Sequence, residues 1–214
     1  MRTRFWPTAI LLLLAVPVFG GDFSRELSAE PIALSNEAVH VVFKAGEMLI
    51  RGTDGSRLEV KLKATCRKPK PRCLRALEDL RIVSEAYNGD IELKFEGVTK
   101  RRARRMDFEV LLEIPESTVL AVKMGLGSLE IENLREDLAV DMWMGELTVR
   151  MAEADVHSVL TDTGIGDASI TAPSNGVDGH RSALVGAEAK WLRGAGTARV
   201  DLDLQIGDIS VRLE

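Results

Sequence analysis

Five glycines in the second half of the chain recur at a nearly constant spacing, and this period constrains the fold more than any other feature. They are Gly127, Gly145, Gly166, Gly186 and Gly207, with separations of 18, 21, 20 and 21 residues. An apolar residue precedes each of them, namely Leu126, Met144, Ile165, Val185 and Ile206. Apolar residues alternate on both sides of most of these glycines, which is typical of two half-buried strands that meet at a bend. Glycine suits the bend because it has no Cβ and accepts positive φ.

A period of about 20 residues predicts an all-β solenoid (β-helix-like), in which each coil buries its inner face against its neighbours. The same unit occurs upstream around Gly46 and, less fully, around Gly89. The unit around Gly186 is the weakest, because Glu188 and Lys190 occupy positions that are apolar in the others. The alternative is an antiparallel β-sandwich, which also alternates strands and turns but gives no reason for one fixed period.

The first 20 residues have the layout of a secretory signal peptide. Arg2 and Arg4 precede an apolar run over 9–19, and small residues follow at Gly20 and Gly21. A run of 11 apolar residues is too short to cross a bilayer, which needs about 20. We therefore expect cleavage after Gly20 and export to the periplasm, the cell surface or the extracellular space, with no transmembrane segment in the mature chain.

The remaining chain is expected to form one domain after a short leader. The leader covers 21–37 and the solenoid domain 38–214, of which 38–114 is less regular and 115–214 carries the regular repeats. The net charge also changes at the boundary between residues 114 and 115. Residues 21–114 hold 18 basic and 16 acidic side chains (net +2), whereas residues 115–214 hold 8 and 17 (net −9).

The two cysteines, Cys66 and Cys73, bracket the basic segment RKPKPR. Two nearby cysteines in an exported protein indicate a structural disulfide, and redox pairs usually have a shorter spacing. A metal site would need further ligands, and the three histidines are scattered through the sequence. We therefore predict a Cys66–Cys73 disulfide and neither a bound metal nor a cofactor.

One dense basic cluster, KRRARR, precedes the strand expected at 106–114. It comprises Lys100, Arg101, Arg102, Arg104 and Arg105, and the segment between the cysteines adds a second basic turn. Arginine pairs with phosphate through two hydrogen bonds, so the cluster is a candidate site for anionic envelope polymers or lipid phosphates. The competing interpretation is a charged hairpin, between strands at 90–95 and 106–114, that protects a sheet edge. Nucleic acid is a poor partner for an exported chain with 26 basic and 33 acidic residues after cleavage.

Carboxylates also recur beside the bends, as Asp141, Asp162 and Asp203 before the glycine and as Glu146, Asp167 and Asp208 after it. Stacked coils lie about 4.8 Å apart, so these residues are expected to form acidic ladders on a solvated edge. Calcium binding is the alternative. The stacking alone satisfies the carboxylate spacing of glycosidases, so it does not indicate catalysis, and no nucleophile–base motif is present. We therefore expect no catalytic residues.

The repeating units MGLGSLEIENL, MWMGELTVRM, DTGIGDASITAP and LQIGDISVRLE resemble the adhesin-like β-strand-repeat domain of unknown function found in bacterial cell-envelope proteins. The resemblance covers most of 38–214 and is strongest after Phe108. It implies a non-catalytic envelope protein with an adhesin-like binding or structural role. The expected partners are an anionic envelope polymer or lipid, or another envelope protein. The alternative function is a β-helical enzyme that acts on polysaccharide.

Overall fold

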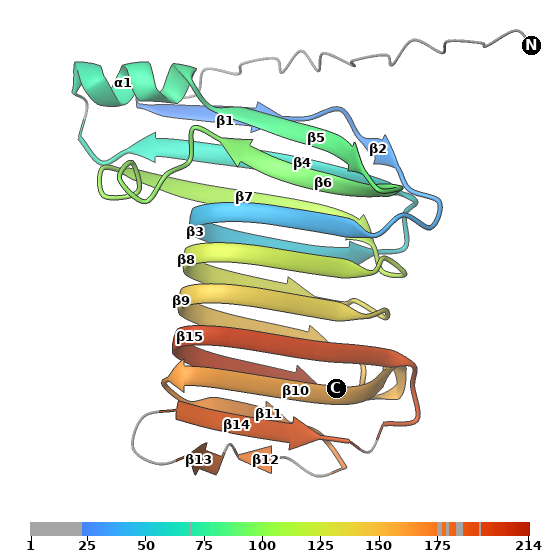
Figure 1. The fold of residues 1–214 in the computed structure, drawn as a ribbon. Coiled ribbons are helices and arrows are strands. Elements are labelled where there is room, and N and C mark those ends of the chain that lie inside the picture. Colours follow the sequence, from blue (N-terminus) through green and yellow to red (C-terminus); the bar gives the residue numbers. More distant parts are fainter. Residues whose placement is uncertain (1–22, 69, 175–176, 179, 183–185, 193) are drawn as a thin grey trace, which may run out of the picture.

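The computed structural model describes residues 23–68, 70–174, 177–178, 180–182, 186–192 and 194–214. In this part of the chain the molecule is all-β, with one short α-helix and a 3-10 turn (Figure 1). The strands are β1 Ser24–Ser28, β2 Ile32–Ala33, β3 Val39–Thr53, β4 Arg57–Cys66, β5 Arg81–Tyr87, β6 Asp90–Glu96, β7 Met106–Pro115, β8 Leu120–Glu132, β9 Leu138–Met151, β10 Val156–Ile165, β11 Ala168–Thr171, β12 Val177–Asp178, β13 His180–Ser182, β14 Gly186–Trp191 and β15 Ala198–Leu213. The helix α1 covers Pro71–Glu78 and the 3-10 turn covers Glu153–Asp155. The predicted signal peptide (1–20) lies outside the described residues, as does Val185.

The long strands fold back on themselves at the repeated glycines. Gly46, Gly127, Gly145, Gly166 and Gly207 have φ values of 135°, 135°, 142°, 141° and 137°. At these residues the chain reverses direction, so the first half of each long strand lies in a front wall and the second half in a rear wall (Figure 1). Alternate side chains of the two walls, such as Val41 and Ile50, meet in the buried core. The bends predicted at these glycines are confirmed.

The parallel strands stack in register, glycine on glycine. β8 pairs with β3 and with β9, and β9 pairs with β15, so that Gly46, Gly127, Gly145 and Gly207 form one column. A Cβ built on Gly145 would lie 1.7 Å from the carbonyl oxygen of Gly127. The layers are therefore in backbone contact at the bend, and no other residue fits there without moving the chain.

The order of the layers in space differs from their order in the sequence. β15 lies between β9 and β10 and pairs with both in parallel, so the expectation that successive coils are neighbours is wrong here. The segment after Gly186 forms β14, which runs antiparallel to β10 on its far side. There Ala187, Ala189 and Trp191 are buried, whereas Glu188 and Lys190 are exposed. The inner face of this segment is shifted by one residue from the repeat, which explains why the weakest unit does not form a regular layer.

Strands β6 and β7 together form the layer next to β3. β6 pairs with the first half of β3 and β7 with its second half, both in parallel. The two strands do not pair with each other, so the predicted hairpin is wrong. The residues between them, 97–105, interrupt this layer at the level where the other layers bend at glycine. Gly89 is not a repeat bend either, because it forms with Asn88 the two-residue turn between β5 and β6, where both residues have positive φ.

Antiparallel strands lie at both ends of this stack. β4 pairs with β7 and β1 pairs with β4 at one end, and β14 and β13 follow β10 at the other. The described strands thus form one large mixed sheet of 15 strands, whose main path begins at β1 and ends at β13 without closing. Two walls face each other as in a sandwich, but the pairing from β3 to β10 is parallel.

The glycine contact makes a testable prediction about stability. Gly145→Ala places a methyl group 1.7 Å from a carbonyl oxygen at a residue with positive φ. We expect it to lower the free energy of unfolding by about 3 kcal/mol or more, as measured by urea denaturation. Gly89→Ala is the control, because φ is also positive there but nothing lies within 4 Å of the added Cβ. It should cost about 1 kcal/mol. Equal losses would contradict the role assigned to the glycine contact.

Candidate anion-binding site

The loop between β6 and β7 carries the predicted basic cluster, but its arginines differ in their surroundings. Arg102 is half-buried and donates hydrogen bonds to the carbonyl oxygens of Gly97 (3.1 Å) and Ala76 (3.5 Å). Its guanidinium also forms an ion pair with Asp79 at 2.6 Å. Arg102 therefore fastens the loop to α1, and its role is structural. Arg101, Arg104 and Arg105 are exposed.

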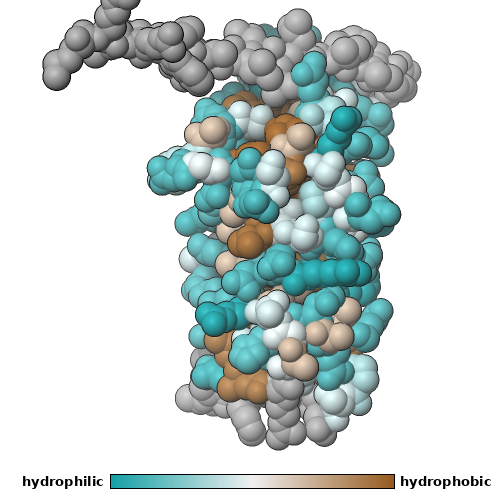
Figure 2. Space-filling model, turned by 90° about the vertical axis from the view of Figure 1, so that its right-hand side faces the viewer, coloured by the Kyte–Doolittle hydropathy of each residue, from teal (hydrophilic) through white to brown (hydrophobic). Residues whose placement is uncertain are grey.

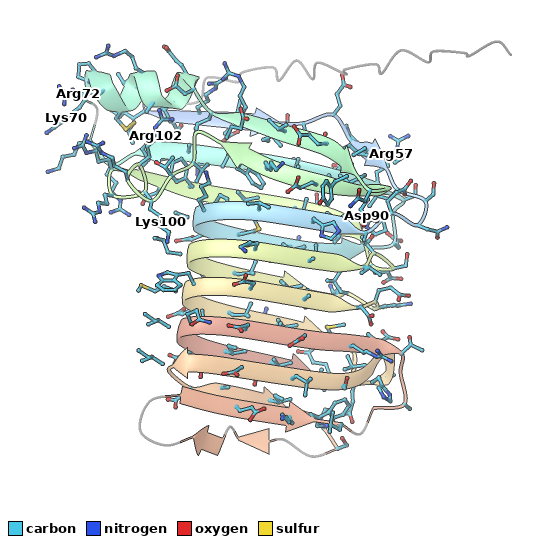
Figure 3. The ribbon with its side chains drawn as sticks, in the orientation of Figure 1. Arg57, Lys70, Arg72, Asp90, Lys100 and Arg102 are labelled. Carbon is cyan, nitrogen blue, oxygen red and sulfur yellow. A yellow bond between two sulfur atoms is a disulfide. The ribbon has the colours of Figure 1, made fainter. Side chains whose placement is uncertain are left out.

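Lys100, at the start of the cluster, extends past the layers of β3 and β8 to β9. Its Nζ is 5.6 Å from the centroid of the Trp143 ring, which belongs to β9. A cation at this distance from an indole face is attracted by the negative charge of the π system. This contact places one end of the basic loop beside the glycine bends. Lys100, Arg102, Lys70 and Arg72 all lie at the same end of the strands, at the left of Figure 3.

The second basic segment is closed by one link and held beside the loop by two others. The first is the Cys66–Cys73 disulfide, as predicted, which connects the end of β4 to α1. The helix begins directly after Lys70, with proline in its first turn, where the missing N–H costs no hydrogen bond. The second link is a backbone hydrogen bond from the Arg67 N–H to the Arg105 carbonyl oxygen (3.0 Å). The third is the ion pair of Arg67 with Asp107, at 2.6 Å.

Between the two basic segments lies an open hollow of about 720 Å³, which we call the cationic hollow. Its lining consists of seven basic side chains together with Pro71 and Cys73; the basic residues are Arg67, Lys68, Lys70, Arg72, Arg75, Arg104 and Arg105. Among the residues that the structure describes, no acidic side chain belongs to this lining. Its basic side chains are exposed, and only Arg67 forms an ion pair within the described part of the chain. The hollow therefore concentrates positive charge that the protein itself does not neutralise.

The chemistry of this lining is that of an anion receptor. The hydrogen bond that Arg67 donates to Asp107, together with the negative charge of this carboxylate, raises the pKa of Arg67, so this guanidinium stays charged. Guanidinium groups bind phosphate, sulfate and carboxylate through paired hydrogen bonds, and lysines add point charges. The hollow is equipped to bind anions.

The structure divides the predicted cluster and enlarges the site. Arg104 and Arg105 line the hollow, Lys100 and Arg101 lie outside its lining, and Arg102 is engaged in the fold. The five basic lining residues from 67 to 75 were not named singly as site residues, although four of them belong to the second basic turn noted in the sequence, RKPKPR. The bracketing cysteines were the available signal, but the pairing of β4 with β7, which brings Cys66 opposite Met106, was not apparent from the sequence.

The acidic ladders are present but are partly neutralised. Asp141 is next to Asp203 in register, Asp203 is next to Asp162, and Lys123 forms an ion pair with Asp141 at 3.4 Å. Within the described ranges, no group of three or more His, Cys, Asp or Glu side chains is arranged to hold a metal ion. Over the same residues, no helix has the length and apolar character needed to span a bilayer.

Comparison with known proteins does not assign the chain to a family. No family model and no curated protein matches the sequence. Similar solved structures include a "putative cell adhesion protein" from Clostridium sporogenes, with 13% identity over 89% of this chain and 100% of that chain and a TM-score of 0.49. A "putative adhesin" from Parabacteroides merdae is 7% identical over 90% and 82% of the two chains, with a TM-score of 0.29. A "putative lipid binding protein" from Parabacteroides distasonis is 9% identical over 62% and 57%, with a TM-score of 0.25. The resemblance to the adhesin-like repeat domain therefore stays a prediction.

Removal of the disulfide should weaken both the fold and the hollow. For a closed loop of eight residues, the chain-entropy model gives about 2.5 kcal/mol of stabilisation. We expect Cys66→Ala/Cys73→Ala to lower the free energy of unfolding by about this amount, as measured by urea denaturation. Dithiothreitol should destabilise the unmodified protein similarly and leave the double variant unchanged. An unfolding curve for the double variant that overlays that of the unmodified protein would contradict a stabilising role.

Proposed function

We propose that this chain is an exported, non-enzymatic envelope protein with an adhesin-like binding role, and that the cationic hollow is its binding site. The observation that carries the proposal is the lining of seven basic residues without a carboxylate. The ligand is a polymer or lipid headgroup that carries phosphate, sulfate or carboxylate groups. Such anions are abundant on cell-envelope surfaces, and anionic lipids attract clustered basic residues.

The architecture proposed with this role is a β-solenoid with layers of about 20 residues. It is supported by the in-register parallel pairing of β3, β8, β9, β15 and β10 and by the bend glycines that recur in each layer. A stack of this kind gives a rigid scaffold with long flat faces. The binding site lies at one end of the scaffold, where the repeat is interrupted.

Export is supported by two features. The N-terminal sequence has the arrangement of a signal peptide, and disulfides persist mainly in oxidising compartments. The Cys66–Cys73 disulfide is therefore in keeping with a periplasmic or extracellular protein.

The composition of the hollow supports binding rather than catalysis at this site. An enzyme that hydrolyses polysaccharide needs two carboxyl groups across the bound sugar. The lining of the cationic hollow contains no such pair. Binding without chemistry is the function that its residues support best.

The first test removes charge from the hollow. We expect Lys70→Ser/Arg72→Ser/Arg104→Ser/Arg105→Ser to weaken binding to polyphosphate, measured by isothermal titration calorimetry, by more than about tenfold, because several charge-assisted hydrogen bonds are lost. Arg102 is left intact, since its substitution would also disturb the packing of α1.

A matched control separates the site from the net charge. Arg57→Ser/Lys61→Ser/Arg199→Ser/Arg212→Ser removes the same charge from exposed residues outside the lining, and it should retain most of the affinity. Arg57, for example, lies at the opposite end of the strands (Figure 3). Equal losses in both variants, or no loss in either, would refute the assignment of the hollow as the binding site.

The second test concerns export. The full-length chain, expressed in a bacterium that secretes proteins, should be recovered from the periplasm or medium with Gly21 as its first residue, because cleavage is expected after Gly20. Intact-mass analysis determines the N-terminus. Recovery from the cytoplasm with residues 1–20 attached would overturn the proposal of export.

A further inference from the structure

The residues that precede the bend glycines form an exposed apolar row along one edge of the molecule. The register of the parallel strands places Leu126, Met144, Ile206 and Ile165 next to one another in this order. Met144 is 42% exposed and Ile165 is 49% exposed, and the other two are half-buried. None of the four belongs to the core. We call these four residues the bend row.

Trp143 extends the bend row toward the basic loop. It is 50% exposed, and it directly precedes Met144. In the neighbouring layer the corresponding residue is Gly125, which has no side chain to cover the indole. The ammonium group of Lys100 lies 5.6 Å from the ring centroid, so the apolar row and the basic loop are in contact. An exposed indole beside basic side chains is an arrangement suited to the boundary between hydrocarbon and lipid headgroups.

The other edge of the molecule is different in character. Figure 2 shows the edge opposite the bends, where the connecting loops lie, and its surface is mostly hydrophilic with separate apolar spots. The continuous apolar row with a basic flank is therefore a feature of the bend edge.

The positive charge of this edge lies at one end. The cationic hollow is beside the ends of β4 and β7, whereas exposed acids directly follow the bend glycines along the column, as Glu47 in β3, Glu146 in β9, Asp208 in β15 and Asp167 in β10. An anionic surface would therefore be attracted by the basic end of the edge rather than by the column. The contact of Lys100 with Trp143 places Trp143 and Met144 next to the basic loop at this end.

We propose that this part of the bend edge docks on an anionic lipid bilayer, with the cationic hollow, Lys100 and Arg101 on the headgroups and Trp143 and Met144 at the boundary with the hydrocarbon. The inference rests on the proposed function, because the hollow supplies the headgroup contacts. It goes further because it names a lipid bilayer as the partner of this edge. A soluble polyanion offers no apolar phase for Trp143 and Met144, whereas a bilayer offers both an anionic surface and an apolar interior.

Vesicle binding by the full chain, as isolated from cells and with its N-terminus determined by mass spectrometry, tests the inference. The vesicles contain phosphatidylglycerol and phosphatidylcholine in equal amounts, or phosphatidylcholine alone. We expect Trp143→Ser/Met144→Ser to lower the partition coefficient on the anionic vesicles about tenfold and to leave binding to soluble polyphosphate unchanged. The control Val119→Ser/Leu192→Ser removes two other exposed apolar side chains and should change partitioning by no more than about twofold.

Hydrogen exchange shows which residues contact the vesicles. It therefore separates contact at the bend edge from contact through the N-terminal segment, which all variants share. Anionic vesicles should protect amides at 97–105 and 140–146, and phosphatidylcholine vesicles should not.

Unchanged partitioning of Trp143→Ser/Met144→Ser, with binding lost in the four-serine hollow variant, would overturn the bilayer inference and leave the proposed function standing. Loss of polyphosphate binding in Trp143→Ser/Met144→Ser would also overturn it, because the row would then belong to a polymer site. Unchanged binding of the hollow variant to both vesicles and polyphosphate would refute both.

Discussion

Contact between the backbones of stacked glycines is the constraint on which the rest of this structure depends. At Gly127, Gly145 and Gly207 an added Cβ would lie 1.7 to 1.8 Å from the carbonyl oxygen of the glycine in the adjacent layer. This contact aligns the layers at one point. Because side chains alternate along a strand, the alignment also decides which residues of both walls face the core. One column of glycines thereby fixes the register of the parallel layers.

The candidate site exists because one layer departs from this constraint. At the level of the glycine column, the layer of β6 and β7 has a nine-residue insertion, 97–105, in place of a glycine bend. The insertion projects from the stack, and α1 and the disulfide bring a second basic segment against it. Arg102 is used to hold the insertion in place, which leaves Arg104 and Arg105 free to line the hollow. The regular layers form the scaffold, and the irregular layer carries two of the basic residues of the candidate site, Arg104 and Arg105.

The sequence was sufficient for features that repeat or lie close together along the chain. The bends at Gly127, Gly145, Gly166 and Gly207 and the pairing of Cys66 with Cys73 followed from spacing. Which layers are neighbours in space did not follow from the sequence. β15 matches β9 and β10 equally well in its apolar alternation, so nothing in the pattern showed that it separates them. The hollow depends on the pairing of β4 with β7, which brings Cys66 opposite Met106, and a single sequence carries no signal for such a pairing.

The position of β15 has a consequence for how the chain is made. The strand formed by residues 198–213 lies in the middle of the sheet, between β9 and β10, which precede it in the sequence. Until these residues leave the ribosome, β9 and β10 expose the edges that β15 later joins, and open strand edges favour aggregation. β3, β8 and β9 can pair in the order of their synthesis, but β10 joins this stack only once β15 is available.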